Sequence, residues 1–156
     1  MTNKIILLIS LFSYAIIVSQ PFMYILALRN TQLGLGGESF TEVRQLIDAN
    51  MRVTLKYALY LALAANLVLL ILNSNAPSGL LFITAAIAFA ALIADVVLTL
   101  KGSIPINNII NNWAPHNYPD NWQEIRDRWF RIFQYRQIIT IIGFSSLVIG
   151  AVFGKR

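Results

Sequence analysis

Few residues of this 156-residue chain could take part in chemistry, and the most informative of them is Asp95. It is the only charged residue inside any of four long apolar runs. Burial raises the proton affinity of a carboxylate, whereas a neighbouring cation lowers it, so Asp95 is either a salt-bridge partner or a base. Arg52, Lys56 and Arg136 stand just outside neighbouring runs and are the candidate cations.

The residue types that are missing or rare narrow the chemistry further. The sequence has no cysteine, which excludes disulfides, thiolate catalysis and cysteine-bound zinc or iron–sulfur clusters. It has one histidine, His116, which is too few for a histidine-based metal centre. We therefore expect no metal and no cofactor. His116 stands between Pro115 and Asn117, and we expect it to lie exposed in a loop.

The elements that must position these residues are membrane-spanning helices. Hydrophobic residues make up 57% of the chain and charged residues only 12%. The apolar runs cover residues 5–28, 57–72, 79–100 and 138–153. A spanning helix needs about 20 residues, so flanking residues extend these runs to spans near 5–28, 54–73, 78–100 and 134–153. Because the runs are continuous rather than alternating, they indicate helices and not a β-barrel. The predicted fold is all-α, a four-transmembrane-helix bundle forming one domain over residues 1–156.

The orientation follows from the basic residues. The first run is longer than the core of a signal peptide and lacks a small-residue cleavage site, so we interpret it as a retained helix. Four spans place both termini on one side, together with Lys4, Lys155 and Arg156. The other side holds nine basic residues: Arg29, Arg44, Arg52, Lys56, Lys101, Arg126, Arg128, Arg131 and Arg136. The excess predicts that the long connections lie in the cytoplasm. The expected location is therefore the bacterial inner membrane, where the protein would be integral.

Two helices should extend beyond the membrane on that same side. Ser39 and Glu42 form a capping box that predicts a helix starting near Phe40. Asp120 and Gln123 form a similar pair before the fourth span. Since no helix-breaking residue follows either start, the second and fourth helices should run from these caps into their spans and be extended beyond the bilayer.

Both extensions have an apolar face. Apolar residues recur at helical spacing at Phe40, Val43, Ile47 and Met51 in the first extension and at Trp122, Ile125, Trp129 and Ile132 in the second. Arg44, Asp48 and Arg52 share another face of the first extension, where i,i+4 ion pairs are expected. Between the third span and Pro119 the chain is rich in asparagine, proline and isoleucine. We expect an ordered loop there, with one helical turn after Pro105, which closes a cavity between the extensions.

Two motifs in this region resemble a known family, the anthrone-oxygenase-like small four-helix membrane proteins, mostly catalogued as a domain of unknown function. Pro105 and Asn107 match a Pro-x-Asn motif after the third span. Trp129 and Arg136 match the ends of a W-x3-H-x2-R motif, in which Phe133 replaces the histidine. The resemblance implies a four-span fold and a cofactor-free oxygenation. A base removes a C–H proton from an anthrone-type substrate, and the carbanion reacts with dioxygen.

The resemblance also implies roles for individual residues. Asp95 would be the base, Arg136 and Asn107 would stabilise the enolate oxygen, and Trp122 and Trp129 would form pocket walls. The remaining expected substrate-binding residues are Gln20, Arg52, Lys56 and Phe133. Simpler roles stay open: the tryptophans could belong to an interfacial belt or a core, Arg136 could reach lipid phosphates, and Asn107 could cap a turn.

Three functions are therefore compatible with the sequence. The first is a cofactor-independent, monooxygenase-like enzyme acting on phenolic apolar substrates. The second is a non-catalytic protein that binds a small apolar molecule or lipid in the same pocket. The third is an accessory subunit whose helical extensions dock another protein. The expected partners are the lipid bilayer and a small apolar molecule. Nucleic acid is not expected, because the net charge of +5 lies at helix ends beside lipid headgroups. The oligomeric state stays open.

Overall fold

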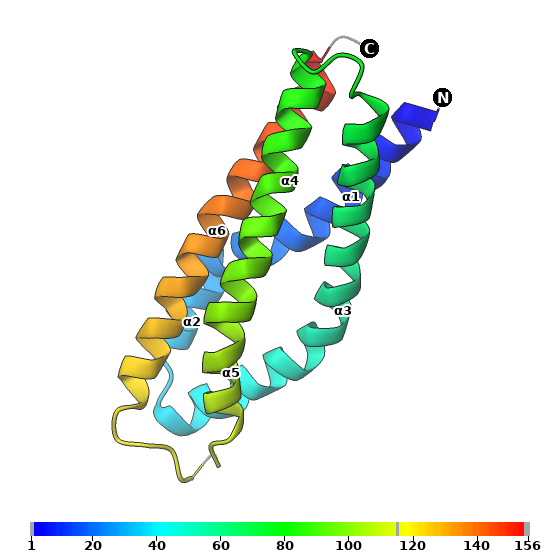
Figure 1. Ribbon diagram of the computed structural model, residues 1–156. Coiled ribbons are helices and arrows are strands. Elements are labelled where there is room, and N and C mark those ends of the chain that lie inside the picture. Colours follow the sequence, from blue (N-terminus) through cyan, green and yellow to red (C-terminus); the bar gives the residue numbers. More distant parts are fainter. Residues whose placement is uncertain (1, 115, 155–156) are drawn as a thin grey trace.

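The computed structural model describes residues 2–114 and 116–154, and it confirms the predicted all-α architecture. Four helical rods form the molecule (Figure 1). The first rod consists of α1 (Thr2–Met23), the π-helical turn η1 (Tyr24–Leu28) and α2 (Arg29–Leu33). The second is α3 (Gly37–Leu72). The third consists of α4 (Leu80–Leu98), the π-helical turn η2 (Thr99–Ser103) and α5 (Ile104–Asn111). The fourth is α6 (Trp122–Phe153).

All four rods are long and apolar enough to cross a membrane. The second rod has 36 residues, and the other three have 32 each. At 1.5 Å per residue even the shorter rods are about 48 Å long, whereas the hydrocarbon layer is about 30 Å thick. We expected only the second and fourth helices to be overlong. That expectation was incomplete, because the π-helical turns η1 and η2 let the first and third rods continue as far.

Both ends of the described chain lie at one end of the bundle (Figure 1). The turn between α3 and α4 lies at this end as well, and Asn3 hydrogen-bonds to Asn73 there. The connections from α2 to α3 and from α5 to α6 lie at the opposite end, called the loop end below. This arrangement agrees with the even number of spans predicted from the sequence.

The third connection differs from the expected loop. Residues 101–111, predicted to be irregular except for one turn, are helical through η2 and α5. Pro105 lies in the first turn of α5, directly after the π-helical turn η2, and it has no N–H with which to continue the helical hydrogen-bond ladder. Ile106 and Ile110 are buried on one face, and this packing holds the segment in a helix.

The helix starts also differ from the predicted caps. In the described chain, α3 is capped by Gly36 and α6 by Asn121, and neither cap makes a side-chain hydrogen bond. Ser39 and Asp120 are therefore not caps. Gly37 lies directly beneath the ring of Tyr118, and a side chain at that position would collide with the ring. A long-range contact thus requires a glycine at the start of α3, which local spacing does not reveal.

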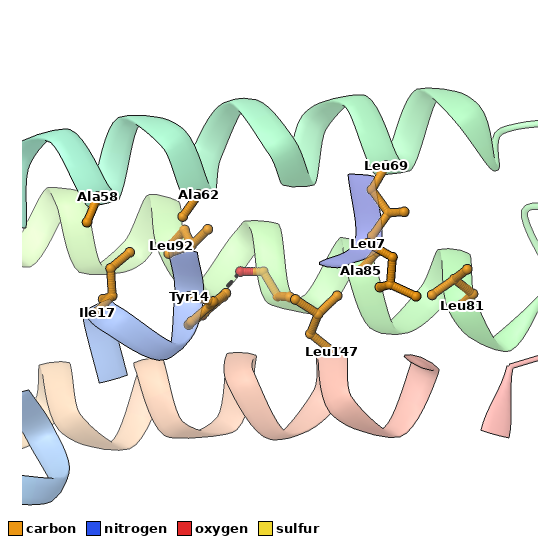
Figure 2. Close-up of a cluster of buried hydrophobic side chains, with 11 residues drawn as sticks. Leu7, Tyr14, Ile17, Ala58, Ala62, Leu69, Leu81, Ala85, Leu92 and Leu147 are labelled. Atoms are coloured by element: carbon orange, nitrogen blue, oxygen red, sulfur yellow. Dashed lines mark hydrogen bonds between the residues drawn. The ribbon is translucent and has the colours of Figure 1, made fainter. Parts of the chain in front are cut away.

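A core at the terminal end holds the four rods together. Figure 2 shows Tyr14 and Leu147 among leucine and alanine side chains of α3 and α4. The hydroxyl of Tyr14 donates a hydrogen bond of 3.4 Å to the carbonyl oxygen of Ala88. Gly143 lets α6 approach, because a side chain there would collide with Tyr14 and Ala91. This core fixes the terminal half of the bundle and leaves the loop-end half to form the site.

Candidate functional site

A cavity of about 490 Å³ lies in the loop-end half of the bundle, a volume that suits a small organic molecule. Residues from all four rods line it. From the first two rods these are Ile17, Gln20, Pro21, Arg44, Asp48, Met51, Arg52, Leu55, Lys56, Leu59, Tyr60 and Leu63. From the other two they are Asp95, Val96, Thr99, Leu100, Ser103, Ile104, Asn107, Trp129, Phe133, Arg136 and Thr140. The lining is mainly apolar, but it contains four cations and two carboxylates.

Asp95 pairs with Arg136 on the cavity wall. Nε of Arg136 donates to Oδ1 of Asp95 at 2.7 Å, and Nη2 donates to Oδ2 at 3.3 Å. Nη1 of the same guanidinium donates to Oγ of Ser103 at 3.2 Å. Asp95 is 2% exposed, so the pair is shielded from solvent and ties α4 to α6. Of the three candidate cations, Arg136 is the partner.

Asp48 is the second carboxylate, and three donors surround it. Asn107 donates to its Oδ1 at 2.8 Å, and Asn111 donates to its Oδ2 at 2.8 Å. Arg52, one helical turn away on α3, donates to Oδ2 at 2.7 Å. This cluster joins α3 to α5. It also orients the Asn107 amide, whose oxygen accepts a hydrogen bond of 2.7 Å from Nε1 of Trp129.

Arg44 is the most unusual cation of the cavity. It is 3% exposed, and it forms no ion pair with any carboxylate in the described chain. Its Nη1 donates to the hydroxyl of Tyr24 at 3.0 Å, and its guanidinium lies 4.2 Å from the ring centre of Trp129. Its Nε is buried without a hydrogen-bond partner among the described residues. Arg44 thus brings a positive charge into the site without a directly paired counterion, because the Asp48 carboxylate that attracts it from one turn along α3 is paired with Arg52.

Aromatic rings form the wall next to Arg44. Trp129 and Phe133 stack with their ring centres 4.9 Å apart and their planes 14° from parallel. The ring centre of Tyr24 lies 4.6 Å from that of Phe133 and 5.7 Å from that of Trp129. Flat apolar surface beside a cation is a suitable environment for a planar aromatic molecule.

Lys56 and Gln20 complete the polar lining. Lys56 lies 5.8 Å from the ring of Tyr60 and forms no ion pair with the described residues. The amide of Gln20 lies 3.5 Å from the sulfur of Met51, a weak acceptor. Arg44 and Lys56 therefore leave the cavity with more positive than negative charge.

Exposed tyrosines indicate where the cavity lies relative to the bilayer. Tyr57, Tyr60 and Tyr135 are each more than half exposed. Tyrosine concentrates where the hydrocarbon meets the headgroups. From Ile138 to Phe153, the outer face of α6 presents large apolar side chains. The cavity therefore lies at the boundary between the apolar belt of the molecule and its loop end.

The structure brings nearly all expected site residues together. Gln20, Arg52, Lys56, Asp95, Asn107, Trp129, Phe133 and Arg136 line the cavity. Trp122 does not; it packs against Phe40 and Tyr118 nearer the loop end. Asn107 lies within α5 rather than capping a turn. His116 is exposed, as expected, with Nδ1 3.0 Å from Oε1 of Glu38.

Sequence reasoning missed Arg44 and Asp48. Their four-residue spacing places them on a face other than the apolar one, but the spacing did not reveal that this face lines the cavity. The structure buries both, whereas Leu46 between them is 64% exposed. A stripe of ionisable residues at four-residue spacing, on a helix that continues into a membrane span, was the available signal. In a membrane protein such a stripe commonly faces the interior, because lipid cannot solvate it.

The loop-end aromatic residues pack against one another. The buried members of this cluster are Tyr24, Phe40, Ile106, Ile110, Trp129, Phe130 and Phe133. The extensions therefore turn their aromatic faces inward, and the accessory-subunit hypothesis loses the exposed surface on which it relied.

Comparison with known proteins adds no further assignment. No family model, curated protein or solved structure matches this chain. Among residues 2–114 and 116–154, no three His, Asp or Glu side chains gather in a way that could hold a metal ion.

Proposed function

We propose that this protein binds an apolar molecule with one acidic group in the cavity at its loop end. The observation that carries the proposal is the buried guanidinium of Arg44, which lines the cavity without a paired carboxylate in the described chain. A buried charge is costly unless it is compensated. An oxyanion of the ligand would supply the missing negative charge, and Lys56 would add a second attraction.

The chemistry of the wall supports an aromatic ligand. The stacked rings of Trp129 and Phe133 lie next to the Arg44 guanidinium. A phenol or an enolisable aromatic ketone combines a flat apolar surface with an oxygen that ionises. Such a molecule would pack against the apolar lining of the cavity while its oxygen interacts with the cations.

A second candidate function is the oxygenation implied by the family resemblance. It is supported by Asn107, Trp129 and Arg136, the motif residues that all line the cavity. In the balanced reaction, anthrone and dioxygen give anthraquinone and water. A base takes a proton from the methylene carbon, and the carbanion forms a carbon–oxygen bond with dioxygen. The resulting hydroperoxide loses water, with O–O cleavage and loss of the second methylene hydrogen, to form the new carbonyl.

Asp95 would be the base in this reaction. Both of its oxygens accept a hydrogen bond from Arg136, and each keeps a second lone pair that could take a proton. As the enolate forms, its oxygen would take over one donor of Arg136. Arg136 would then stabilise the enolate, and the proton would move to Asp95.

The binding proposal can be tested with two ligands of similar shape. Anthrone can ionise to an enolate, whereas anthracene cannot. We expect purified protein in nanodiscs to bind anthrone at least tenfold more tightly than anthracene in equilibrium binding measurements. Arg44→Gln should remove this preference. Arg128→Gln, a change on the exposed face of α6 outside the cavity, should preserve it. Equal affinities for the two ligands in the native protein would refute the proposal.

Oxygen consumption tests the second candidate separately. If the protein is an oxygenase, anthrone should be converted to anthraquinone faster than in protein-free nanodiscs, with one dioxygen consumed per product. Asp95→Asn should abolish the acceleration in protein that remains folded. If the protein binds anthrone tightly but does not accelerate its conversion to anthraquinone, the binding function stands and the oxygenase function is rejected.

The proposed location is the bacterial inner membrane, with the loop end in the cytoplasm. It is supported by four candidate spans and by the nine basic residues on the loop-end side against three on the terminal side.

A further inference from the structure

We infer that the ligand enters the cavity sideways from the bilayer, through an opening between α3 and the η2–α5 segment. This inference rests on the proposed function for the identity of the ligand. It concerns a separate property, namely the side from which the cavity is reached.

The walls of the cavity are unequal. On α1 and α6 the lining residues Pro21, Phe133 and Thr140 are buried, so these helices close the cavity. On the other side, Tyr60 of α3 is 55% exposed and Leu100 of η2 is 59% exposed. Both residues line the cavity and are also exposed on the outer surface of the molecule. The cavity is therefore open between these two rods.

The surroundings of this opening are apolar. Tyr57 and Leu61 on α3 and Ile93 and Val97 on α4 present exposed side chains near Tyr60 and Leu100 in the sequence. Exposed apolar side chains on spanning helices face acyl chains. The opening therefore faces lipid rather than water.

The loop end of the cavity is closed by hydrogen bonds between α3 and the end of the third rod. Nε2 of Gln45 donates to the carbonyl oxygens of Ile110 and Trp113, both at 2.9 Å. Asn107 and Asn111 bind Asp48 one turn farther along α3. These contacts join the two rods on the side that faces water, which makes the lateral route the open one.

The charges at the opening match a ligand with an acidic head. Lys56 and Arg52 lie one and two turns from Tyr60 toward the loop end, and the Arg52 side chain is 58% exposed. The rim is thus apolar toward the bilayer centre and cationic toward the headgroups. A molecule dissolved in the bilayer with its acidic group at headgroup depth has the same polarity, so it can enter without reorienting.

The absence of cysteine from the sequence allows a direct test by labelling of single cysteines. Leu59→Cys places a thiol on the cavity wall. In proteoliposomes, we expect a maleimide carried on a fatty-acyl chain to label it at least tenfold faster than a membrane-impermeant sulfonated maleimide. Ile93→Cys, exposed and outside the cavity, is the positive control. Leu147→Cys is the negative control, because Leu147 is fully buried in the core at the terminal end of the bundle.

A second change tests the opening itself. Leu100→Trp narrows it, and we expect acyl-maleimide labelling of Leu59→Cys to fall at least tenfold while labelling of Ile93→Cys is unchanged. Faster labelling of Leu59→Cys by the sulfonated reagent, or no effect of Leu100→Trp, would overturn lateral entry. Because no ligand is used, failure of anthrone binding would reject the proposed function without affecting this result.

Discussion

The guanidinium of Arg136 on α6 holds both carboxylate oxygens of Asp95 on α4, with distances of 2.7 and 3.3 Å. The two residues are 41 positions apart in the sequence, and the Asp95 carboxylate is almost completely buried. The pair therefore joins two spanning helices in a region where neither charge can be well solvated by water. Both the stability of the bundle and any chemistry in the cavity depend on it.

Removing one member of this pair should be more harmful than removing both. Asp95→Asn leaves the Arg136 charge without its partner, and we expect a loss of about 3–5 kcal/mol in the free energy of unfolding. The double variant Asp95→Asn with Arg136→Gln should recover at least half of that loss. Denaturant unfolding in detergent micelles would measure both. A double variant as unstable as the sum of the single variants would contradict the pairing.

The Asp48 cluster should contribute more to stability than a surface ion pair. Asp48→Asn replaces a carboxylate, which only accepts hydrogen bonds, with an amide. The NH2 group of this new amide would face the NH2 group of Asn107 or Asn111, and two donors cannot bond to each other. We expect a loss of about 2–4 kcal/mol, because hydrogen bonds to a charged group are each worth about 1.5–3 kcal/mol.

The matched control for this variant is Asp127→Asn, which breaks a pair with Arg126 in which the aspartate is 56% exposed. Exposed pairs contribute about 0–1 kcal/mol. Equal effects of Asp48→Asn and Asp127→Asn on the unfolding midpoint would show that the cluster does not join α3 to α5 in the folded protein.

Close contact between α6 and its neighbours depends on Gly143. A Cβ there would meet the Tyr14 hydroxyl and Ala91, so Gly143→Ala should destabilise the protein by about 1–3 kcal/mol through overpacking. Gly34→Ala is the control, because its Cβ would make only ordinary contacts, the nearest at 3.6 Å. Thermal unfolding should separate the two variants; a neutral Gly143→Ala would refute the close packing of α6.

The orientation in the membrane can be read from two exposed loop positions. Asn75→Cys lies in the turn at the terminal end, and Asn117→Cys lies in the connection at the loop end. If the loop end is cytoplasmic, an impermeant maleimide added to intact cells should label Asn75→Cys and should label Asn117→Cys only after lysis. The reverse pattern would invert the proposed orientation.

The sequence alone determined the number of spans, the all-α class and the shared side of the two ends. Lipid offers no hydrogen bonds to the backbone, so long continuous apolar runs must form helices, and four of them return the chain to its starting side. The need of Asp95 for a cation was equally evident, because an unpaired charge within an apolar run is unstable. The motif residues Asn107, Trp129 and Arg136 line one cavity, and the roles expected of them stay predictions.

Only the tertiary structure decided which groups meet inside the bundle. Arg52, Lys56 and Arg136 were equivalent candidates for Asp95 until the packing of α4 on α6 selected Arg136. The i,i+4 spacing of Arg44 and Asp48 put them on one face of α3, but it did not reveal that this face points inward. That direction depends on partners far away in the sequence, since Asn107 is 59 positions from Asp48 and Trp129 belongs to another rod. Spacing specifies a face of a helix, whereas the burial of that face depends on the other helices packed against it.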